Sequence, residues 1–504
     1  MSDVLAPAES SGRLRSKVLG GLAWKAGSQM VLQVTRFAVA LVLARLLTPG
    51  DFGLAAMVIV FAGVVVLITD SALGVALVQR RALSEVQRST AFWLGAGIGA
   101  LCTVGGIAFS GTLAGFYGQP EVRPLFVALS LGFFVGSLGT VQSALLTREM
   151  NFRVLELRLM GATLVGAATA LSLAAAGFGA WAIVGQQLAT VTASTVLLWM
   201  LAPWRPKLRF SLGELRGLGS FTGNVFGQNF IYYVGRSLPN VLIGRAVGAS
   251  PLGVYSLANN VMLAPFNQIA APLQQVLFPA FAQLQDDRER LAEIWIRVAR
   301  LVGAIATPAL VGIVVVAPDF VDSVLGHKWH AAARILRILA LVGLLQALQT
   351  LNGEVLLALG KARALLNFTA IWFGANTAAV VVGLHWGIVG VACGCAAAAI
   401  VVEPLNAYIT ARALEMSVWP FVRAFAGIAE AAVVMGVVVF GIRALLVSQG
   451  MPALARLVLC VAVGVGVYVP VCAWRAREVA TEVRGLLGGR RVSQVGAASA
   501  PASA

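Results

Sequence analysis

FGLAAMVIVFAGVVVLIT, residues 52–69, decides the fold, because it contains no charged residue and is long enough to cross a bilayer as a helix. About 20 apolar residues in an α-helix span the roughly 30 Å hydrocarbon core. In hydrocarbon every backbone N–H and C=O must be paired within the chain, which leaves helices or closed barrels. The stretch lacks the alternation of a barrel strand, so it predicts a transmembrane helix.

The whole composition agrees with this stretch. The chain has 504 residues, of which 59% are hydrophobic and 12% charged, and its mean hydropathy is +0.87. Soluble domains carry about 25% charged residues, so a soluble protein is excluded. Similar apolar runs predict an all-α integral membrane protein of about 14 spans. The predicted organisation is a cytoplasmic tail (1–20), a six-span lobe (21–203), a cytoplasmic loop (204–216), a second six-span lobe (217–412), two further spans (413–476) and a disordered cytoplasmic tail (477–504).

The formal net charge of +16 reflects topology. Lysine and arginine concentrate on alternate loops, as the positive-inside rule requires, which predicts a multi-pass protein of the inner membrane with both termini in the cytoplasm. Basic residues spread over alternate loops do not form the continuous patch of a nucleic-acid-binding protein. Every loop is too short for a soluble domain.

The two predicted lobes share identities at a spacing of 200 residues. Arg36 matches Arg236, Gly53 matches Gly253, and further matches are Gly27 with Gly227, Val34 with Val234 and Arg45 with Arg245. Six spans separate the two copies, so both enter the membrane from the same side. This predicts a parallel repeat about an axis along the membrane normal, which is a transporter arrangement.

Six segments carry a family resemblance. They are LTPGDFGLAAM (47–57), TREMNFRVLELRLM (147–160), GFGAWAIVGQQL (177–188), LGVYSLANN (252–260), LQQVLFPAFAQLQDDRERL (273–291) and LLALGKARALLN (356–367). With these segments the chain resembles the polysaccharide transporter branch of the multidrug/oligosaccharidyl-lipid/polysaccharide flippase superfamily.

The resemblance implies two lobes around a central cavity that work by alternating access. It implies a lipid-linked oligosaccharide substrate, usually on a polyprenyl diphosphate, in surface polysaccharide biosynthesis such as the O-antigen or exopolysaccharide pathways. Glycosyltransferases or a polysaccharide polymerase of the same pathway would be partners, besides the membrane lipid. The implied class is a transporter and not an enzyme, and the chain has no P-loop motif for nucleotide binding.

Three cations fall inside predicted spans. Arg36 and Lys25 lie on the first span, and Arg236 lies at the matching position of the seventh. Ionisable groups inside a membrane are costly and usually face a cavity or a partner. We therefore interpret the three as cavity residues that bind the diphosphate or acidic sugars. For Lys25, snorkelling of the ammonium group to the cytoplasmic headgroups is an open alternative.

Three acids are also placed inside or near the ends of spans, namely Asp70, Glu403 and Glu430. They are candidates for binding a coupling proton or sodium ion, or for pairing with an arginine. No other cofactor is expected. The five cysteines lie in apolar runs without nearby histidine or carboxylate partners, so no metal site is predicted.

Polar side chains that suit sugar hydroxyls cluster on the seventh and eighth spans. They include Asn224, Gln228, Asn229, Tyr232 and Asn259, for which hydrogen bonding between helices is the alternative. Two other functions stay open. A cation-coupled drug exporter of the same fold would favour acidic cavity residues, and a membrane polymerase or ligase would need a large external loop.

Overall fold

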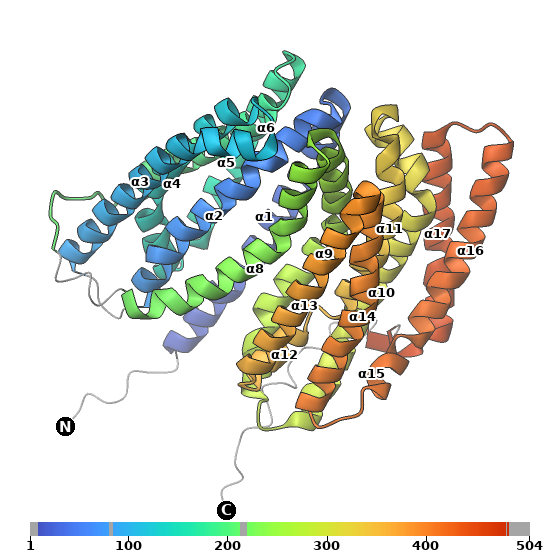
Figure 1. Cartoon of the computed structure of the whole chain (residues 1–504). Coiled ribbons are helices and arrows are strands. Elements are labelled where there is room, and N and C mark those ends of the chain that lie inside the picture. Colours follow the sequence, from blue (N-terminus) through green and yellow to red (C-terminus); the bar gives the residue numbers. More distant parts are fainter. Residues whose placement is uncertain (1–8, 80–83, 212–218, 480, 483–504) are drawn as a thin grey trace, which may run out of the picture. The chain divides into compact units, whose positions relative to one another are not determined.

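A computed structural model describes residues 9–79, 84–211, 219–479 and 481–482. Within the helices, the side chains of residues 9–26, 68–79, 219–229, 231–232, 265–276 and 278–279 lie outside the described part. The chain divides into two compact units (Figure 1). Unit 1 comprises residues 1–257 and 380–391, and unit 2 comprises residues 258–379 and 392–504.

Unit 1 is a bundle of long helices. Neighbours in sequence pack as antiparallel pairs, α3 with α4 and α5 with α6, while α2 packs on α4 and α8. Common capping motifs bound α3. Ser84 and Gln87 form a capping box at its start, and Gly118, with φ 65°, ends the helix. The helices are α1 (Glu9–Leu46), α2 (Pro49–Gln79), α3 (Glu85–Tyr117), α4 (Val122–Arg148), α5 (Phe152–Ala175), α6 (Trp181–Leu201), α8 (Gly219–Ala246) and the first residues of α9 (Ala249–Gln283).

Unit 2 contains the remainder of α9 and the rest of the chain except residues 380–391, which include η3. Its core is the packing of α10 on α11, α16 and α17. The elements are α10 (Arg288–Phe320), η1 (Val321–Leu325), η2 (His327–Trp329), α11 (His330–Leu348), α12 (Asn352–Ala358), α13 (Ala362–Gly383), η3 (Leu384–Trp386), α14 (Gly387–Ala413), α15 (Trp419–Ala424), α16 (Ala426–Ser448) and α17 (Ala453–Arg475). The end of α13 and the start of α14 are assigned to unit 1.

The predicted all-α membrane fold is confirmed. Among the described residues no strand occurs, and 11 helical segments are long and apolar enough to cross a bilayer. One of these segments, Ala362–Ala413, contains both α13 and α14. The count of about 14 spans stays a prediction, because α8 and α9 include side chains outside the described part.

The repeat is visible in one reciprocal contact at the start of α2 and α9. A Cβ atom on Gly53 would lie 1.7 Å from the carbonyl oxygen of Ala249, and one on Gly253 would lie 1.8 Å from that of Pro49. Pro49 and Ala249 are themselves 200 residues apart. Exchanging the two copies of the repeat therefore turns the contact of Gly53 with Ala249 into the contact of Gly253 with Pro49. Exchange of this kind is the mark of a two-fold relation. It supports the repeat, and it explains why both positions are glycine.

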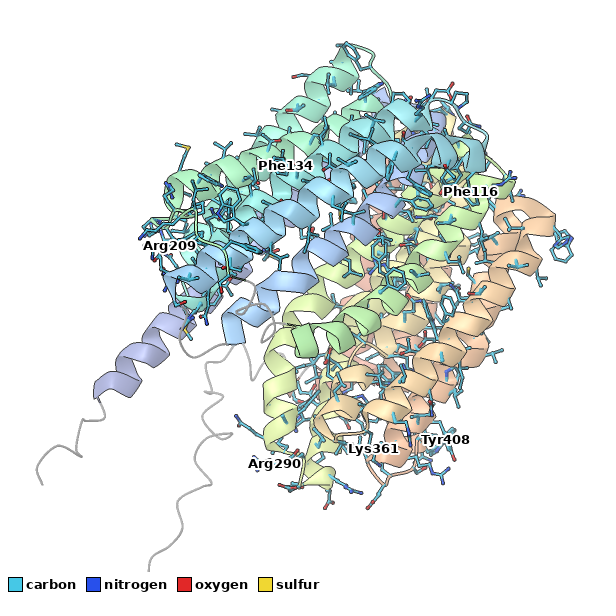
Figure 2. The ribbon with its side chains drawn as sticks, turned by 60° about the vertical axis from the view of Figure 1, so that its left-hand side comes forward. Phe116, Phe134, Arg209, Arg290, Lys361 and Tyr408 are labelled. Carbon is cyan, nitrogen blue, oxygen red and sulfur yellow. The ribbon has the colours of Figure 1, made fainter. Side chains whose placement is uncertain are left out.

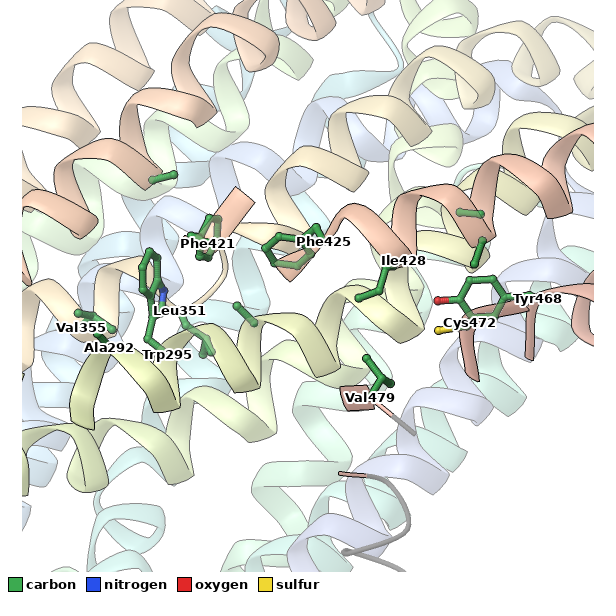
Figure 3. Close-up of a cluster of buried hydrophobic side chains, with 14 of the residues drawn as sticks. Ala292, Trp295, Leu351, Val355, Phe421, Phe425, Ile428, Tyr468, Cys472 and Val479 are labelled. Carbon is green, nitrogen blue, oxygen red and sulfur yellow. The ribbon is translucent and has the colours of Figure 1, made fainter. Parts of the chain in front are cut away.

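A cluster of aromatic and aliphatic side chains forms the core of unit 2 (Figure 3). The indole of Trp295 stacks on Phe421 with 4.3 Å between ring centroids. Its N–H donates to Asn352 Oδ1 at 3.0 Å, and both residues are buried. The hydrogen bond satisfies a polar group that would otherwise be costly inside the bundle.

Two prolines interrupt the hydrogen bonds of α10, and neighbouring helices satisfy the carbonyl groups that they free. Pro308 has no N–H, so the carbonyl of Ala304 loses its helical donor. The hydroxyl of Tyr468 on α17 donates to that carbonyl at 2.7 Å. This bond ties α17 to the middle of α10.

Figure 2 shows Arg290, Lys361 and Tyr408 together at one end of unit 2. At this end Arg300 pairs with Glu478 and Glu482, and Arg475 pairs with Glu430. The described residues of the predicted tail, 477–479 and 481–482, are helical. In unit 1, Arg209 and Phe116 lie at opposite ends (Figure 2).

We expect Gly53→Ala to lower the free energy of unfolding by about 1–3 kcal/mol, because the new methyl group forces the backbones of α2 and α9 apart. Thermal unfolding of the purified protein in detergent measures the loss. The control is Gly50→Ala in the first turn of the same helix, where the nearest heavy atom to a new Cβ is Thr48 Oγ1 at 3.7 Å. Equal stability of the two variants would contradict the reciprocal contact.

We expect Tyr468→Phe to cost about 0.5–1.5 kcal/mol, the range of hydrogen bonds between membrane helices. In a Pro308→Ala background the same change should cost nearly nothing, because the restored N–H of residue 308 then donates to Ala304. A double-mutant cycle on unfolding free energies measures the coupling. The same loss in both backgrounds would show that the hydroxyl does not replace the missing helical bond.

Candidate functional site

The two matched arginines both lie in unit 1 and are both exposed on its surface. Arg36 is on α1 and Arg236 is on α8. The segment that contains Arg36, Gly27–Leu46, is a candidate span. A guanidinium exposed at this depth faces either lipid or a water-filled space, and the second is far less costly. The structure shows both guanidinium groups exposed, and their role as cavity residues stays a prediction.

Arg236 flanks the contact between α8 and α2. One turn before it, Tyr233 donates its hydroxyl to the carbonyl of Val60 on α2 at 2.9 Å. Gly63 makes room for this ring, since a Cβ there would lie 1.9 Å from the Tyr233 oxygen. Arg236 lies close enough to Tyr233 to act on it electrostatically. The tyrosine therefore fixes the helix turn from which Arg236 extends.

Two polar residues, Ser28 and Gln29, precede Arg36 on α1. Gln29, seven residues before it and on the same helix face, donates to Glu156 Oε2 on α5 at 3.0 Å. Ser28 donates to the same oxygen at 2.9 Å. Glu156 is 4% exposed, so its carboxyl group is buried between α1 and α5. The two hydrogen bonds offset part of the cost of burying this polar group.

Glu156 is a residue that sequence reasoning missed. It lies inside the motif TREMNFRVLELRLM, yet its neighbours Arg153 and Arg158 suggest a charged helix end and not a buried acid. The available signal was the pair of polar residues Ser28 and Gln29 in an otherwise apolar first span. Lys25, four residues before Gln29, falls on the same face of α1, but its side chain lies outside the described part.

The predicted acids have different surroundings. Glu430 on α16 is exposed and pairs with Arg475 at the end of α17. Glu403 on α14 is 5% exposed and lies beside Asn406, one turn later, which is 8% exposed. Asn406 Oδ1 is buried and accepts no hydrogen bond from any described residue. Asp70 lies in α2, with its side chain outside the described part.

The structure only partly places the predicted sugar contacts. Asn259 is half-buried on α9, in unit 2. The others lie on α8, where their side chains are outside the described part: Asn224, Gln228, Asn229 and Tyr232. Among the described residues no group of three or more histidine, cysteine or acidic side chains could hold a metal ion.

Comparison with known proteins identifies the family of the chain. Residues 42–334 match the family model described as polysaccharide biosynthesis protein. The lipopolysaccharide biosynthesis protein WzxC of Escherichia coli is 30% identical over 70% of this chain and 72% of its own length. The teichuronic acid biosynthesis protein TuaB of Bacillus subtilis is 29% identical over 69% of this chain and 73% of its own length. The succinoglycan biosynthesis transport protein ExoT of Rhizobium meliloti is 28% identical over 70% and 73%.

Solved structures share the fold at low sequence identity. The lipid II flippase MurJ in its inward closed conformation superimposes with a TM-score of 0.72 at 11% identity, over 90% of this chain and all of MurJ. An inward-facing multidrug transporter of the MATE family, in the MOP superfamily, gives a TM-score of 0.60 at 16% identity, over 77% of this chain and 96% of the transporter. These likenesses concern the fold alone.

Proposed function

Since the chain belongs to the polysaccharide biosynthesis protein family, we propose that it is a flippase that carries a lipid-linked oligosaccharide from the cytoplasmic to the outer leaflet. The resemblance to polysaccharide transporters found in the sequence is confirmed by these relatives. The chain is a multi-span membrane protein and a transporter, not an enzyme. Alternating access of the two repeats is the expected mechanism.

The observation that carries the substrate class is the pair Arg36 and Arg236, exposed at repeat-related positions of α1 and α8. An anion is attracted to a cation far more strongly in a low-dielectric crevice than in water. A polyprenyl diphosphate offers such an anion at a fixed position in every substrate, whatever sugars it carries. A guanidinium group can donate two parallel N–H···O hydrogen bonds to a phosphate group, which favours arginine at both positions.

Other residues and the surrounding membrane complete the proposed site. Lys25 would add a third cation near the cytoplasmic entrance. Sugar hydroxyls would be bound by amides and phenols of α8 and α9, such as Asn224, Gln228, Asn229, Tyr232 and Asn259. The basic loops favour an inner-membrane protein with both termini in the cytoplasm. Glycosyltransferases or a polymerase of the same pathway would supply and consume the glycolipid.

A coupled exporter of small drugs is the second candidate, because a MATE transporter shares the fold. Cationic drugs require acidic groups where this chain exposes Arg36 and Arg236. Of the acids named in the sequence, Glu430 is paired with Arg475. The charge of the exposed groups therefore favours an anionic cargo. A polymerase or ligase is disfavoured by the family relatives, among which ExoT is a transport protein.

We expect Arg36→Gln and Arg236→Gln each to lower export of the lipid-linked glycan about tenfold, the effect of losing one charge-assisted hydrogen bond. The double variant should lower export further. Accumulation of the glycolipid on the cytoplasmic face of cells measures export. Arg45→Gln and Arg245→Gln are matched controls, because these arginines are also related by the repeat but lie at the ends of α1 and α8. Wild-type export by the Arg36/Arg236 double variant would exclude the diphosphate site.

We place the coupling ion, a proton or sodium, at Glu403. If Glu403 is protonated, its O–H group could donate to Asn406 Oδ1. A sodium ion could instead be bound by a carboxylate oxygen of Glu403 together with Asn406 Oδ1. Either ion would give the buried Asn406 Oδ1 a partner. We expect Glu403→Gln to keep glycolipid binding but to abolish the dependence of transport on the ion gradient. Transport in proteoliposomes with imposed proton or sodium gradients measures this, with Glu430→Gln as the exposed control. Unchanged gradient dependence in Glu403→Gln would assign the coupling elsewhere.

A further inference from the structure

A cluster of arginines lies at the end of α10 opposite to Arg288, close to Pro318. Pro318 cannot donate to the carbonyl of Val314, four residues earlier. Arg337 on α11 donates its Nε–H to this carbonyl at 3.1 Å. The carbonyl group freed by Pro318 therefore holds an arginine of the next helix by its Nε atom.

The residue after the proline, Asp319, anchors two more arginines. Asp319 is 1% exposed, and Arg443 on α16 donates its Nε–H to Oδ2. Arg456 on α17 donates to Oδ1 through Nε at 2.9 Å and contacts the same oxygen through its terminal nitrogen at 2.7 Å. Its other terminal nitrogen donates to the carbonyl of Met451 at 2.8 Å. Each of the three nitrogens of Arg456 thereby contacts an acceptor within the protein.

The cluster has more positive than negative charge. Arg337, Arg443 and Arg456 surround the single carboxylate of Asp319, and Arg337 and Arg443 repel each other electrostatically. The terminal N–H groups of Arg337 and Arg443 meet no hydrogen-bond acceptor among the described residues, whereas Arg443 is only 18% exposed. Arg337 and Arg443 are both anchored at this end of α10, by Val314 and Asp319 respectively. Two such guanidinium groups favour binding of an anion, because each carries unused donors and the anion relieves their repulsion.

A second acid, Asp322, follows Asp319 three residues later. Asp322, in the π-helical turn after α10, faces the Nδ1 atoms of His327 at 3.8 Å and His330 at 3.5 Å. No ion pair joins Asp322 to Arg337 or Arg443 in the described part of the chain.

We propose that Arg337 and Arg443 form a phosphate-binding site, with Asp319 and Arg456 positioning the second of them. By the distribution of basic loops this end of unit 2 is the outer face, where lipid headgroups lie. The planar forks of two arginines fit a phosphate ester that carries one to two negative charges. The ligand is the phosphate of a lipid at the outer boundary or a soluble phosphate there, and the site is separate from Arg36 and Arg236.

Binding is tested with the purified full chain in phosphatidylcholine nanodiscs. One arm adds soluble pyrophosphate at constant ionic strength, and the other incorporates phosphatidic acid in the discs. We expect the unfolding temperature of the wild type to rise in one or both arms. A rise in the lipid arm alone assigns the site to a lipid phosphate, and a rise in the pyrophosphate arm as well assigns it to any phosphate that reaches this face.

Variants separate the site from general charge effects. Arg337→Gln changes an exposed residue, and Arg443→Lys keeps the charge beside Asp319 but removes the fork. Each should weaken binding about tenfold. Arg334→Gln, one turn earlier on α11 and also exposed, is the matched control and should bind as the wild type does. No rise in either arm for the wild type, or equal binding by Arg337→Gln and the wild type, would overturn the proposal.

Discussion

The interior of a bilayer contains no water, so each polar group inside it must find its partner within the chain. The consequences are visible at several positions. The carbonyl freed by Pro308 accepts from Tyr468, the indole of Trp295 donates to Asn352, and Glu156 is held by Ser28 and Gln29. These bonds connect helices far apart in sequence, so the constraint on single groups also builds the tertiary structure.

The same constraint singles out the groups that remain unsatisfied. Arg36 and Arg236 are exposed on unit 1, Asn406 Oδ1 is buried without a donor in the described residues, and Arg337 and Arg443 keep unused N–H groups. In a soluble protein such groups would be hydrated and would carry no information. In or beside a bilayer less water reaches them, so each of them is a candidate for contact with a ligand.

Periodicity and charge were sufficient to predict the helical membrane fold, and a spacing of 200 residues was sufficient to predict the repeat that the Gly53 and Gly253 contacts support. The partners of individual side chains could not be predicted. Asp319 meets Arg443 and Arg456 across separations of 124 and 137 residues, and only the packing of α10 on α16 and α17 brings them together. Glu156 was missed for a similar reason: nothing local distinguishes a buried acid from one at a helix end.

The central claim, that the chain moves an anionic glycolipid, is tested most directly by reconstitution. A polyprenyl-diphosphate-linked oligosaccharide is placed in the inner leaflet of proteoliposomes, and its sugar is made accessible to a membrane-impermeant glycosidase only after translocation. The account predicts that cleavage exceeds that in protein-free liposomes and that a cationic dye in the same vesicles is retained. Cleavage at the protein-free level together with export of the dye would contradict it.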